Sequence, residues 1–280
     1  MKLMVAGGAG FIGSNFIHYM LAAHPDYDII NFDKLTYAGN LDNLKDIETN
    51  PHYHFENGDI TDLTRISEVM QKYGVTHLIN FAAETHVDRS IHGGIKDFVL
   101  TNSLGVQMLL DAVRANGIER MINVSTDEVY GALKLGENTF FTEDTPIMPN
   151  MPYAAAKAGG DLMCHAYYVT HKVPVIVTHC SNNYGPYQFP EKLIPFFIFK
   201  AMNNESVPVY GDGLNVRDWI HAMDHSSALD LLLHAGDQPL RAARDIHAAE
   251  QLVHRVVRGA VVHVARVEVA SFHQTFFFAE

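Results

Sequence analysis

Two side chains at positions 153 and 157 could together remove a proton from a substrate. Tyr153 and Lys157 are four residues apart in a segment that is predicted to be helical, so they share one helix face. A phenol has an ordinary pKa near ~10, and a neighbouring ammonium stabilises the phenolate and lowers that value. Tyr153 could then accept a hydroxyl proton while a hydride leaves the same carbon. A Tyr and a Lys at this spacing also occur by chance on exposed helices.

Three polar residues follow a predicted strand at Met121–Ser125. Ligands of doubly wound sheets bind at the carboxyl ends of strands, so Thr126 could hydrogen-bond a substrate hydroxyl beside Tyr153. Asp127 and Glu128 are adjacent carboxylates, and two like charges in one pocket push their pKa values apart. One can then act as an acid and the other as a base, as an elimination of water requires. The alternative is a solvated acidic turn with no chemical role.

A glycine loop near the amino terminus predicts a dinucleotide site. Gly7, Gly10 and Gly13 form the pattern G-x-x-G-x-x-G between a predicted strand, Leu3–Val5, and a predicted helix, Phe11–Ala23. Glycines allow a tight turn and let a pyrophosphate approach the backbone, while the helix amino terminus supplies amide donors and a positive dipole. The strand before and the helix after the loop are the context that this motif requires.

Asp33 follows the second predicted strand, 20 residues beyond Gly13. A carboxylate there accepts hydrogen bonds from an adenosine ribose and repels a 2′-phosphate, which favours NAD over NADP. The nicotinamide cation would further stabilise the Tyr153 phenolate. Asp59 follows the third predicted strand and could accept from the adenine amine, although a helix-capping role fits it equally well.

The scaffold for these residues is predicted to be an α/β fold with a doubly wound, Rossmann-like parallel sheet. Short β-rich runs alternate with helix-length segments, and the continuously apolar strands indicate a sheet that is covered on both faces. The predicted strands are Leu3–Val5, Asp28–Phe32, His52–Glu56, Thr76–Phe81, Met121–Ser125 and Val173–Thr178. The predicted helices are Phe11–Ala23, Leu41–Glu48, Leu63–Tyr73, Ile95–Asn116 and Tyr153–Thr170.

The chain after about residue 180 is less regular and predicts a smaller lobe over the sheet edge. Its expected elements are a loop at Ser181–Pro190, helices at Lys192–Asn203 and Asp224–His234, and a short strand at Val207–Tyr210. The expected division is a dinucleotide-binding domain carrying the catalytic residues at 1–180, a partial substrate-binding lobe at 181–240 and a divergent tail at 241–280.

The last 40 residues differ in composition from the rest. All ten lysines lie within residues 1–200, whereas five of the ten arginines lie in residues 241–280, a segment without Pro, Tyr or Asn. Two explanations stay open: a tail of different sequence origin, which leaves the substrate lobe truncated or altered, or an unusual but genuine lobe.

Bulk properties exclude several classes of protein. The formal charge is −12 at pH 7, with 32 acidic against 20 basic residues, which disfavours nucleic-acid binding. The sequence has no run of about 18 apolar residues, so no membrane span is expected. The glycine loop comes too early in the chain for a signal peptide to be expected. Cys164 and Cys180 are expected to be buried thiols in a reducing compartment, so the expected location is the cytoplasm. The histidines are scattered, and no metal site is expected.

Seven features together resemble the dTDP-glucose 4,6-dehydratase family, within the extended short-chain dehydrogenase/reductases. The resemblance covers residues 1 to about 235. The matching features are Gly7–Gly13, Asp33–Asn40, Ala82–Ser90, Ser125–Gly131, the Tyr153/Lys157 pair, Ser181–Lys192 and Gly211–Trp219.

The resemblance implies a dehydration in three steps. Tyr153, assisted by Thr126 and Lys157, oxidises carbon 4 of dTDP-glucose with NAD⁺. Glu128 then removes the proton of carbon 5, and Asp127 protonates the hydroxyl that leaves carbon 6. NADH returns the hydride to carbon 6, which gives dTDP-4-keto-6-deoxyglucose, a precursor of rhamnose and other deoxysugars.

The resemblance also implies binding residues and a homodimer. The cofactor-binding residues would be Gly7, Gly10, Phe11, Ile12, Gly13, Asp33, Lys34, Thr36, Asp59, Ile60, Ala82, Ala83, Tyr153 and Lys157. The substrate-binding residues would be Glu84, His86, Thr126, Asn183, Glu191, Lys192 and Arg217. Two subunits would pair through the long helices at Ile95–Asn116 and Tyr153–Thr170.

Departures from the family pattern leave alternatives open. Ala6, Thr85 and Ala154 are tolerable changes, whereas His179 stands where the family commonly has Arg. From about Leu240 no family match is found in the sequence. The alternatives are a UDP-sugar in place of the dTDP-sugar, a nucleotide-sugar epimerase, and an NAD-binding relic without turnover. Epimerases typically carry small residues in place of the Asp127/Glu128 pair.

Overall fold

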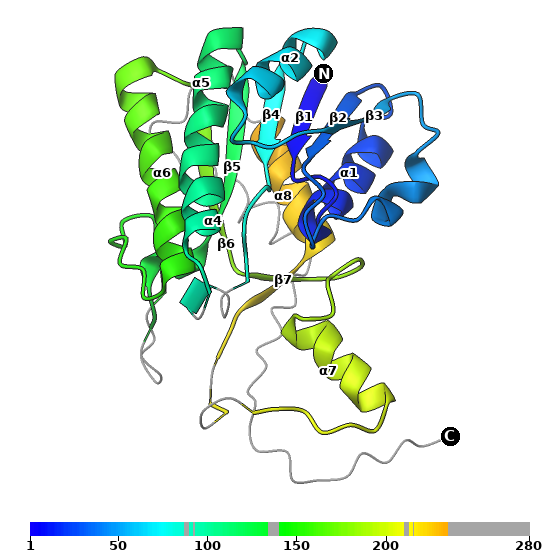
Figure 1. The fold of residues 1–280 in the computed structure, drawn as a ribbon, viewed down its shortest axis with the longest axis vertical. Helices are drawn as coiled ribbons and strands as arrows, with labels where there is room; N and C mark the ends of the chain where they lie inside the picture. Colours follow the sequence, from blue (N-terminus) through cyan, green and yellow to red (C-terminus); the bar gives the residue numbers. More distant parts are fainter. Residues whose placement is uncertain (87–89, 92, 134–139, 210–212, 215, 235–280) are drawn as a thin grey trace.

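Six parallel strands form the central sheet, in the order β3-β2-β1-β4-β5-β6 (Figure 1). The computed structural model describes residues 1–86, 90–91, 93–133, 140–209, 213–214 and 216–234. The strands are β1 (Lys2–Ala6), β2 (Asp28–Asp33), β3 (Tyr53–Asn57), β4 (His77–Asn80), β5 (Arg120–Thr126) and β6 (Val175–Cys180). All the pairings are parallel, so the expected doubly wound α/β fold is confirmed.

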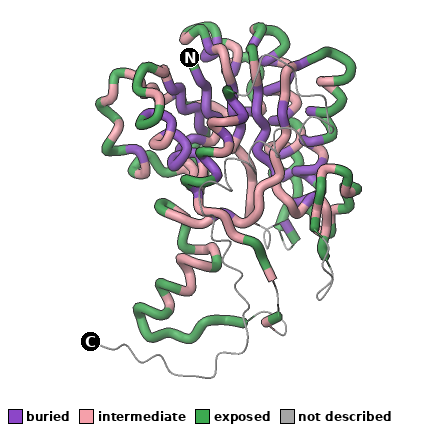
Figure 2. The backbone as a smooth tube through the Cα atoms, turned by 180° about the vertical axis from the view of Figure 1, so that it is seen from behind, coloured by how far each residue is buried: buried purple, intermediate pink, exposed green. Residues whose placement is uncertain are grey.

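Alternation along the strands divides the core between the two faces of the sheet. Met4 and Ala6 of β1 face one layer, and Leu3 and Val5 face the other, because successive side chains of a strand point to opposite faces. The first layer is built by helices α2 (Leu63–Tyr73), α5 (Val106–Asn116) and α6 (Pro152–His171), and the second by α1 (Phe11–Ala23) and α8 (Ala222–His234). Buried residues therefore concentrate around the sheet (Figure 2).

The long helix expected at Ile95–Asn116 has an irregular middle. It consists of α4 (Lys96–Val99), a π-helical turn, η2 (Leu100–Gly105), and α5. Asn102 of this turn donates to the Glu84 carbonyl and accepts from the Glu84 amide, both at 3.0 Å. A π-turn is common at functional sites, and this one places Asn102 against the segment that follows β4. The helix expected at Leu41–Glu48 is a 3₁₀-helix, η1 (Leu41–Ile47).

Two short strands after β6 form a second parallel sheet. Asn182–Tyr184 (β7) pairs with Trp219–His221 (β8), so the loop expected at Ser181–Pro190 was wrong over β7. The strand expected at Val207–Tyr210 is wrong over Val207–Val209, which has no regular structure, and Tyr210 lies outside the described residues. Helix α7 (Leu193–Met202) follows β7 and has no buried residue, as Figure 2 shows. The motif stretches at 87–89, 211–212 and 215, and the tail at 241–280, also lie outside the described residues.

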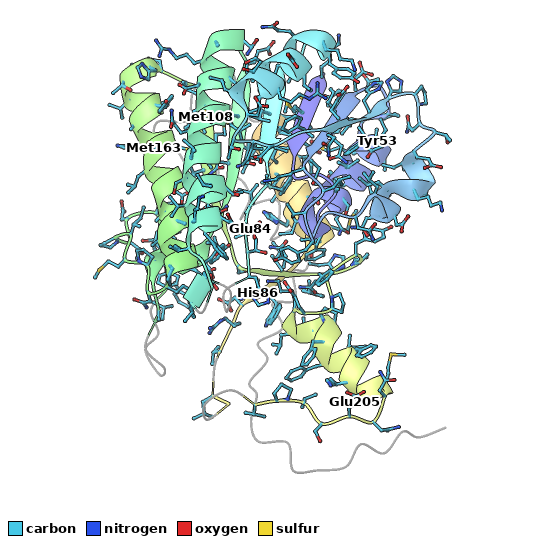
Figure 3. All side chains as sticks on the ribbon, in the orientation of Figure 1. Tyr53, Glu84, His86, Met108, Met163 and Glu205 are labelled. Atoms are coloured by element: carbon cyan, nitrogen blue, oxygen red, sulfur yellow. The ribbon has the colours of Figure 1, made fainter. Side chains whose placement is uncertain are left out.

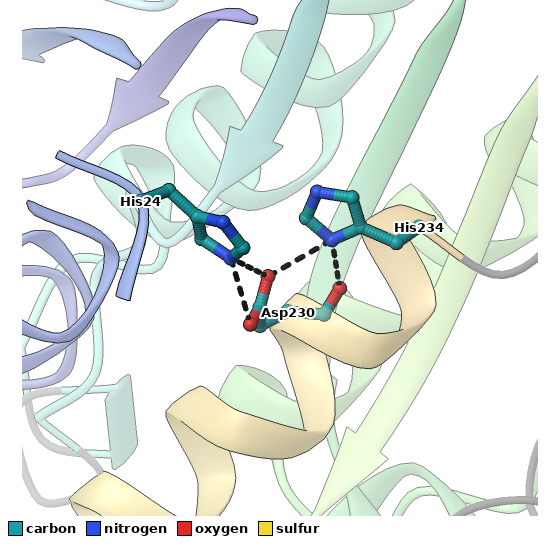
Figure 4. A group of neighbouring side chains, drawn as sticks. All are labelled: His24, Asp230 and His234. Atoms are coloured by element: carbon teal, nitrogen blue, oxygen red, sulfur yellow. Dashed lines mark hydrogen bonds and ion pairs between the residues drawn. The ribbon is translucent and has the colours of Figure 1, made fainter. Parts of the chain in front are cut away.

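Helix α8 returns from the small sheet to the main one. Leu229, Leu232 and Leu233 join α1 in the second core layer. Asp230 bonds the His24 ring at 2.9 Å and the His234 ring at 2.9 Å, which ties α8 to the end of α1 (Figure 4). Both histidine rings bond the same carboxylate. These hydrogen bonds account for the clustering of His24, Asp230 and His234. The packing of α8 on the main sheet counts against a separate lobe that contains all of residues 181–240. The expected division of the chain into parts at residues 180 and 240 stays a prediction.

Candidate active site

A pocket opens where the strand order reverses, beside the carboxyl ends of β1, β2 and β4. Ligands of open α/β sheets bind at such a switch point. Its lining includes most of the expected cofactor residues and one expected substrate residue: Gly7, Gly10, Asp33, Lys34, Thr36, Asp59, Ile60, Ala82, Ala83 and Glu84. Phe11, Ile12 and Gly13 lie just beyond it, in the first turn of α1.

The glycine loop packs so closely that side chains are excluded at two positions. A Cβ at Gly7 would lie 2.5 Å from the Ala82 nitrogen, and Gly7 has a positive φ of 76°. A Cβ at Gly13 would lie 2.4 Å from the Gly7 carbonyl oxygen. Helix α1 begins after Gly10 without a side-chain cap, so the pocket faces a helix amino terminus that can receive an anion.

The Asp33 carboxylate is held at the end of β2 by backbone donors. The amides of Ala9 and Leu35 donate to its two oxygens at 2.9 and 2.7 Å. Burial raises the Asp33 pKa, and these two donors oppose the shift. The carboxylate is thereby fixed beside the glycine loop.

Lys34 and Asp59 form an ion pair at the same pocket, 2.6 Å apart. Burial tends to raise the pKa of Asp59, but the hydrogen bonds from Lys34 and Thr61 outweigh it, and the pKa lies below its ordinary value. Asp59 also accepts from the Thr61 amide at 2.9 Å within the turn before α2. Asp62, not Asp59, caps α2, so the alternative capping role expected for Asp59 is wrong.

Tyr153 and Lys157 lie on the buried face of α6, against β5. Lys157 Nζ donates to the Val124 carbonyl at 2.7 Å, and burial lowers the Lys157 pKa. Burial raises the pKa of Tyr153, and the nearby Glu128 carboxyl raises it further. The protein's own groups therefore do not produce the lowered phenol pKa that the Tyr–Lys spacing predicts.

Asp127 and Glu128 begin the turn η3 (Asp127–Tyr130), directly after β5. Thr126 caps this turn by accepting from the Glu128 amide at 3.3 Å. Burial raises the pKa of both carboxyls, and the Asp127 charge raises that of Glu128 further. Glu128 Oε2 is buried and has no hydrogen-bond partner among the described residues. The solvated acidic turn that was the alternative is therefore wrong.

Part of the expected substrate set gathers between the sheet and α7. Glu191 lies 3.5 Å from both the His86 ring and Lys192 Nζ, and Lys192 also donates to the Thr85 carbonyl at 3.4 Å. Figure 3 shows Glu84 and His86 along the segment after β4, on the side of the sheet that faces α7.

Two other expected substrate residues differ in setting. Asn183 on β7 is buried, and its Oδ1 lies 2.9 Å from His225 Nδ1. Arg217 donates to the Val216 carbonyl at 2.8 Å. Its positive charge partly opposes the rise in the pKa values of Asp127 and Glu128. Arg217 is therefore close enough to the carboxyl pair to act on it.

The sequence does not predict a binding role for six of the pocket residues: Phe32, Ala38, Gly39, Gly58, Phe81 and Thr101. Ala38 and Gly39 belong to the quoted Asp33–Asn40 segment, so a signal was available for them. Thr101 lies on the π-turn, and nothing in its sequence context indicates that this turn reaches the pocket.

The parallel doubly wound sheet, the glycine cradle, and the Tyr153/Lys157 pair on α6 define a protein of the short-chain dehydrogenase/reductase class. The profile described as GDP-mannose 4,6 dehydratase matches residues 4–274. The chain belongs to this family. The match continues through most of the tail at 241–280, where the motifs alone indicate no relationship.

Curated relatives match across most of the chain. The low-salt glycan biosynthesis protein Agl12 of Haloferax volcanii is 49% identical over 237 residues, which are 85% of this chain and 74% of that protein. A dTDP-glucose 4,6-dehydratase of Streptomyces griseus is 50% identical over 230 residues, 81% of this chain and 68% of that protein.

Solved structures give the same relationships. The dTDP-glucose 4,6-dehydratase of Bacillus anthracis in complex with NAD has a TM-score of 0.79 at 46% identity, covering 92% of this chain and 81% of that chain. A UDP-glucuronic acid 4-epimerase of Bacillus cereus has a TM-score of 0.77 at 26% identity, covering 84% and 74%. Within the described ranges, no helix is long and apolar enough to cross a bilayer.

Proposed function

We propose that this protein is an NAD-dependent dTDP-glucose 4,6-dehydratase. The observation that carries the proposal is the Asp127/Glu128 pair, half-buried and adjacent to Tyr153, with both carboxyl pKa values raised. The similarity to dTDP-glucose 4,6-dehydratases at 46–50% identity supports the same substrate. The more distant 26% identity to an epimerase, and the carboxyl pair itself, disfavour epimerisation.

The pocket fits the adenosine and pyrophosphate parts of NAD. The crowding at Gly7 and Gly13 gives a backbone cradle at the start of α1, which suits a pyrophosphate. Asp33 is placed to accept from a ribose, and its charge disfavours a 2′-phosphate. When bound, NAD⁺ supplies the hydride acceptor for carbon 4 and, once reduced, the hydride donor for carbon 6.

The protein's own residues supply the proton transfers. Tyr153 takes the proton of the carbon 4 hydroxyl, with Thr126 hydrogen-bonding that oxygen. The charges of Lys157 and of bound NAD⁺ would together oppose the rise that burial causes in the Tyr153 pKa. Glu128 has a buried oxygen that accepts no hydrogen bond from the described chain and acts as the base at carbon 5. The Asp127 carboxyl, whose raised pKa favours its protonated form, protonates the hydroxyl that leaves carbon 6.

The nucleoside diphosphate is proposed to bind between the sheet and α7. Lys192 and Arg217 are cations that suit phosphate oxygens. Glu191 holds Lys192 and His86 at 3.5 Å, and Glu84 lies in the pocket lining. The buried Asn183 on β7 lies at the edge of this binding region, where its contact with His225 of α8 holds it in place.

We also propose a homodimer in the cytoplasm. Leu162, Met163 and Val169 of α6 are exposed, as are Val99 and Leu104 of the adjoining helix. These exposed apolar side chains lie on the two helices that the family resemblance assigns to pairing. The two cysteines of the described chain are unpaired, which suits a reducing compartment.

Mass spectrometry tests the activity directly. The purified protein is incubated with dTDP-glucose, first without added NAD and then with it. Loss of one water from the sugar nucleotide is the expected result, and loss without added NAD shows that the cofactor co-purifies. UDP-glucose and GDP-mannose in parallel reactions test the base preference. An unchanged mass of dTDP-glucose with folded, NAD-loaded protein refutes the proposal.

A further inference from the structure

The buried carboxylate of Asp161 lies at the centre of a polar network beside the proposed catalytic residues. Asp161 is on α6, one helical turn after Lys157 and two turns after Tyr153. Its side chain is 4% exposed. Ser125 Oγ donates to it at 2.7 Å and Asn123 Nδ2 at 3.3 Å. A buried charge is costly unless donors surround it in this way.

Through these bonds, α6 holds three consecutive residues of β5. Asn123 and Ser125 donate to Asp161, and the intervening Val124 carbonyl accepts from Lys157 Nζ at 2.7 Å. Thr126 follows directly. Two α6 residues one turn apart therefore determine where the end of β5 lies relative to Tyr153.

Asn123 also connects the network to the proposed cofactor pocket. Its Oδ1 accepts from Asn80 Nδ2 at 2.9 Å, and Asn80 Oδ1 accepts from the Ala82 amide at 3.1 Å. Ala82 lines the pocket.

His179 extends the network from Asp161 to the acidic turn. Its Nε2 lies 3.2 Å from Asp161 Oδ2, and its Nδ1 lies 2.9 Å from the Tyr130 hydroxyl. An ionised carboxylate only accepts, so Nε2 carries a proton. In the tautomer with its single proton on Nε2, Nδ1 accepts a hydrogen bond from the Tyr130 hydroxyl. Tyr130 closes η3, the turn that begins with Asp127 and Glu128.

The charge of Asp161 acts on both members of the Tyr–Lys pair. Burial lowers the Lys157 pKa, and Asp161 opposes that shift. Burial is the largest cause of the raised Tyr153 pKa, and the Glu128 charge is the next. Asp161 is among the groups that raise it by a smaller amount. Removing the Asp161 charge therefore lowers both pKa values. The titratable groups that interact with Asp161 are Tyr130, Tyr153, Lys157, Cys164 and His179.

We propose that Asp161 is a positioning residue of the dehydratase site. Its hydrogen bonds fix β5 and η3 relative to Tyr153, and its charge sets the pH range over which Tyr153 and Lys157 work. This inference rests on the proposed function where turnover is the readout.

Asp161→Asn tests the charge, because it preserves the size of the side chain. We expect the kcat for dTDP-glucose to fall ten-fold or more, with NAD retained and KM little changed, and both limbs of the kcat–pH profile to move to lower pH. Asp161→Glu keeps the charge but misplaces it, so kcat should fall while the limbs stay in place.

Asp111→Asn is the matched control. Asp111 on α5 accepts from Tyr167 of α6 at 2.8 Å, so this variant removes another carboxylate that contacts α6. It should leave both the rate and the limbs unchanged. Unshifted limbs in Asp161→Asn overturn the proposal even if the rate falls, because a purely structural role lowers the rate equally at every pH.

A second readout does not depend on turnover. The ¹⁵N NMR signals of His179, assigned by their loss in His179→Gln, report which ring nitrogen carries the proton. We expect the Nε2–H tautomer in the native protein at alkaline pH. The Nδ1–H tautomer overturns the proposal, whether or not dTDP-glucose is converted and whether or not the Asp161 variants fold. If the tautomer is as expected but dTDP-glucose is unchanged, the proposed function fails and the Asp161–His179 arrangement stands.

Discussion

Among single residues, Asp127, Glu128 and Tyr153 have pKa values that follow from burial more than from spacing in the sequence. Burial is the largest cause of the raised pKa in all three, and each carboxyl adds to the shift of Tyr153. Adjacent carboxyls at the end of a strand could equally have been solvated. The fold makes them a candidate acid and base by enclosing them.

The division of labour between Asp127 and Glu128 can be separated by solvent exchange. In D₂O, we expect Asp127→Asn to incorporate deuterium at carbon 5 without losing water, because Glu128 still removes that proton. Glu128→Gln should show neither exchange nor dehydration. Each change should lower dehydration by about 10²- to 10⁴-fold, measured by mass spectrometry. Exchange at carbon 5 by Glu128→Gln contradicts the assignment.

The acid limb of carbon 5 exchange depends on Asp127 and Glu128. Glu128 must be ionised to act as a base, so carbon 5 exchange should slow as the pH drops through its raised pKa. The Asp127 charge contributes to that rise, so in Asp127→Asn the acid limb of carbon 5 exchange should move to lower pH. A limb that stays in place, or moves upward, shows that the two carboxyls are not coupled.

Between elements, close approach of backbones determines what the glycine loop tolerates. Gly13 lies in the first turn of α1, where a Cβ would meet the carbonyl oxygen of Gly7 and the Cα of Gly8. We expect Gly13→Ala to lower the free energy of unfolding by roughly 1–3 kcal/mol and to release NAD. Gly94→Ala is the control, because a Cβ there meets nothing within 4 Å. Denaturant titration and absorbance of bound NAD measure the two effects, and equal behaviour of the variants refutes the steric argument.

The contact between β7 and α8 predicts a pH-dependent stability. Burial lowers the pKa of His225 from 6.5 to about 4. Below pH 6.5 the unfolded chain takes up a proton that the folded chain does not, so His225 costs about 3 kcal/mol of stability as the pH falls towards 4. His225→Gln should flatten that part of the stability curve. Denaturant titrations at pH 7 and pH 4.5 measure the free energy of unfolding of both proteins. An equal loss of stability between these pH values in the native protein and in His225→Gln contradicts the argument.

For the whole molecule, the proposed homodimer depends on the exposed apolar side chains of α6 and the adjoining helix. Leu162 of α6 is 56% exposed. We expect light scattering to give a dimer for the native protein and a monomer for Leu162→Glu. Met202→Glu on α7, which is 79% exposed, should remain dimeric. A monomeric native protein refutes the dimer.

The local pattern of this sequence determined the elements, the glycine loop and the chemical type of the catalytic residues. Periodicity and the order of strands and helices are properties of short segments, so the sheet and its carboxyl-end residues could be predicted. The β7–β8 pairing could not, because it joins strands whose three-residue segments carry no period of their own. The π-turn at Asn102 and the return of α8 to the sheet also depend on partners far along the chain.

Tertiary structure alone decided the electrostatics. Nothing near Asp161 in sequence indicates that Ser125, Asn123 and His179 converge on it, because they come from two other strands. The raised Tyr153 pKa likewise depends on how deeply α6 is buried and on carboxyls from the turn after β5. Residue type and spacing can be read from the chain, whereas desolvation and charge coupling arise only when distant segments exclude water from the same space.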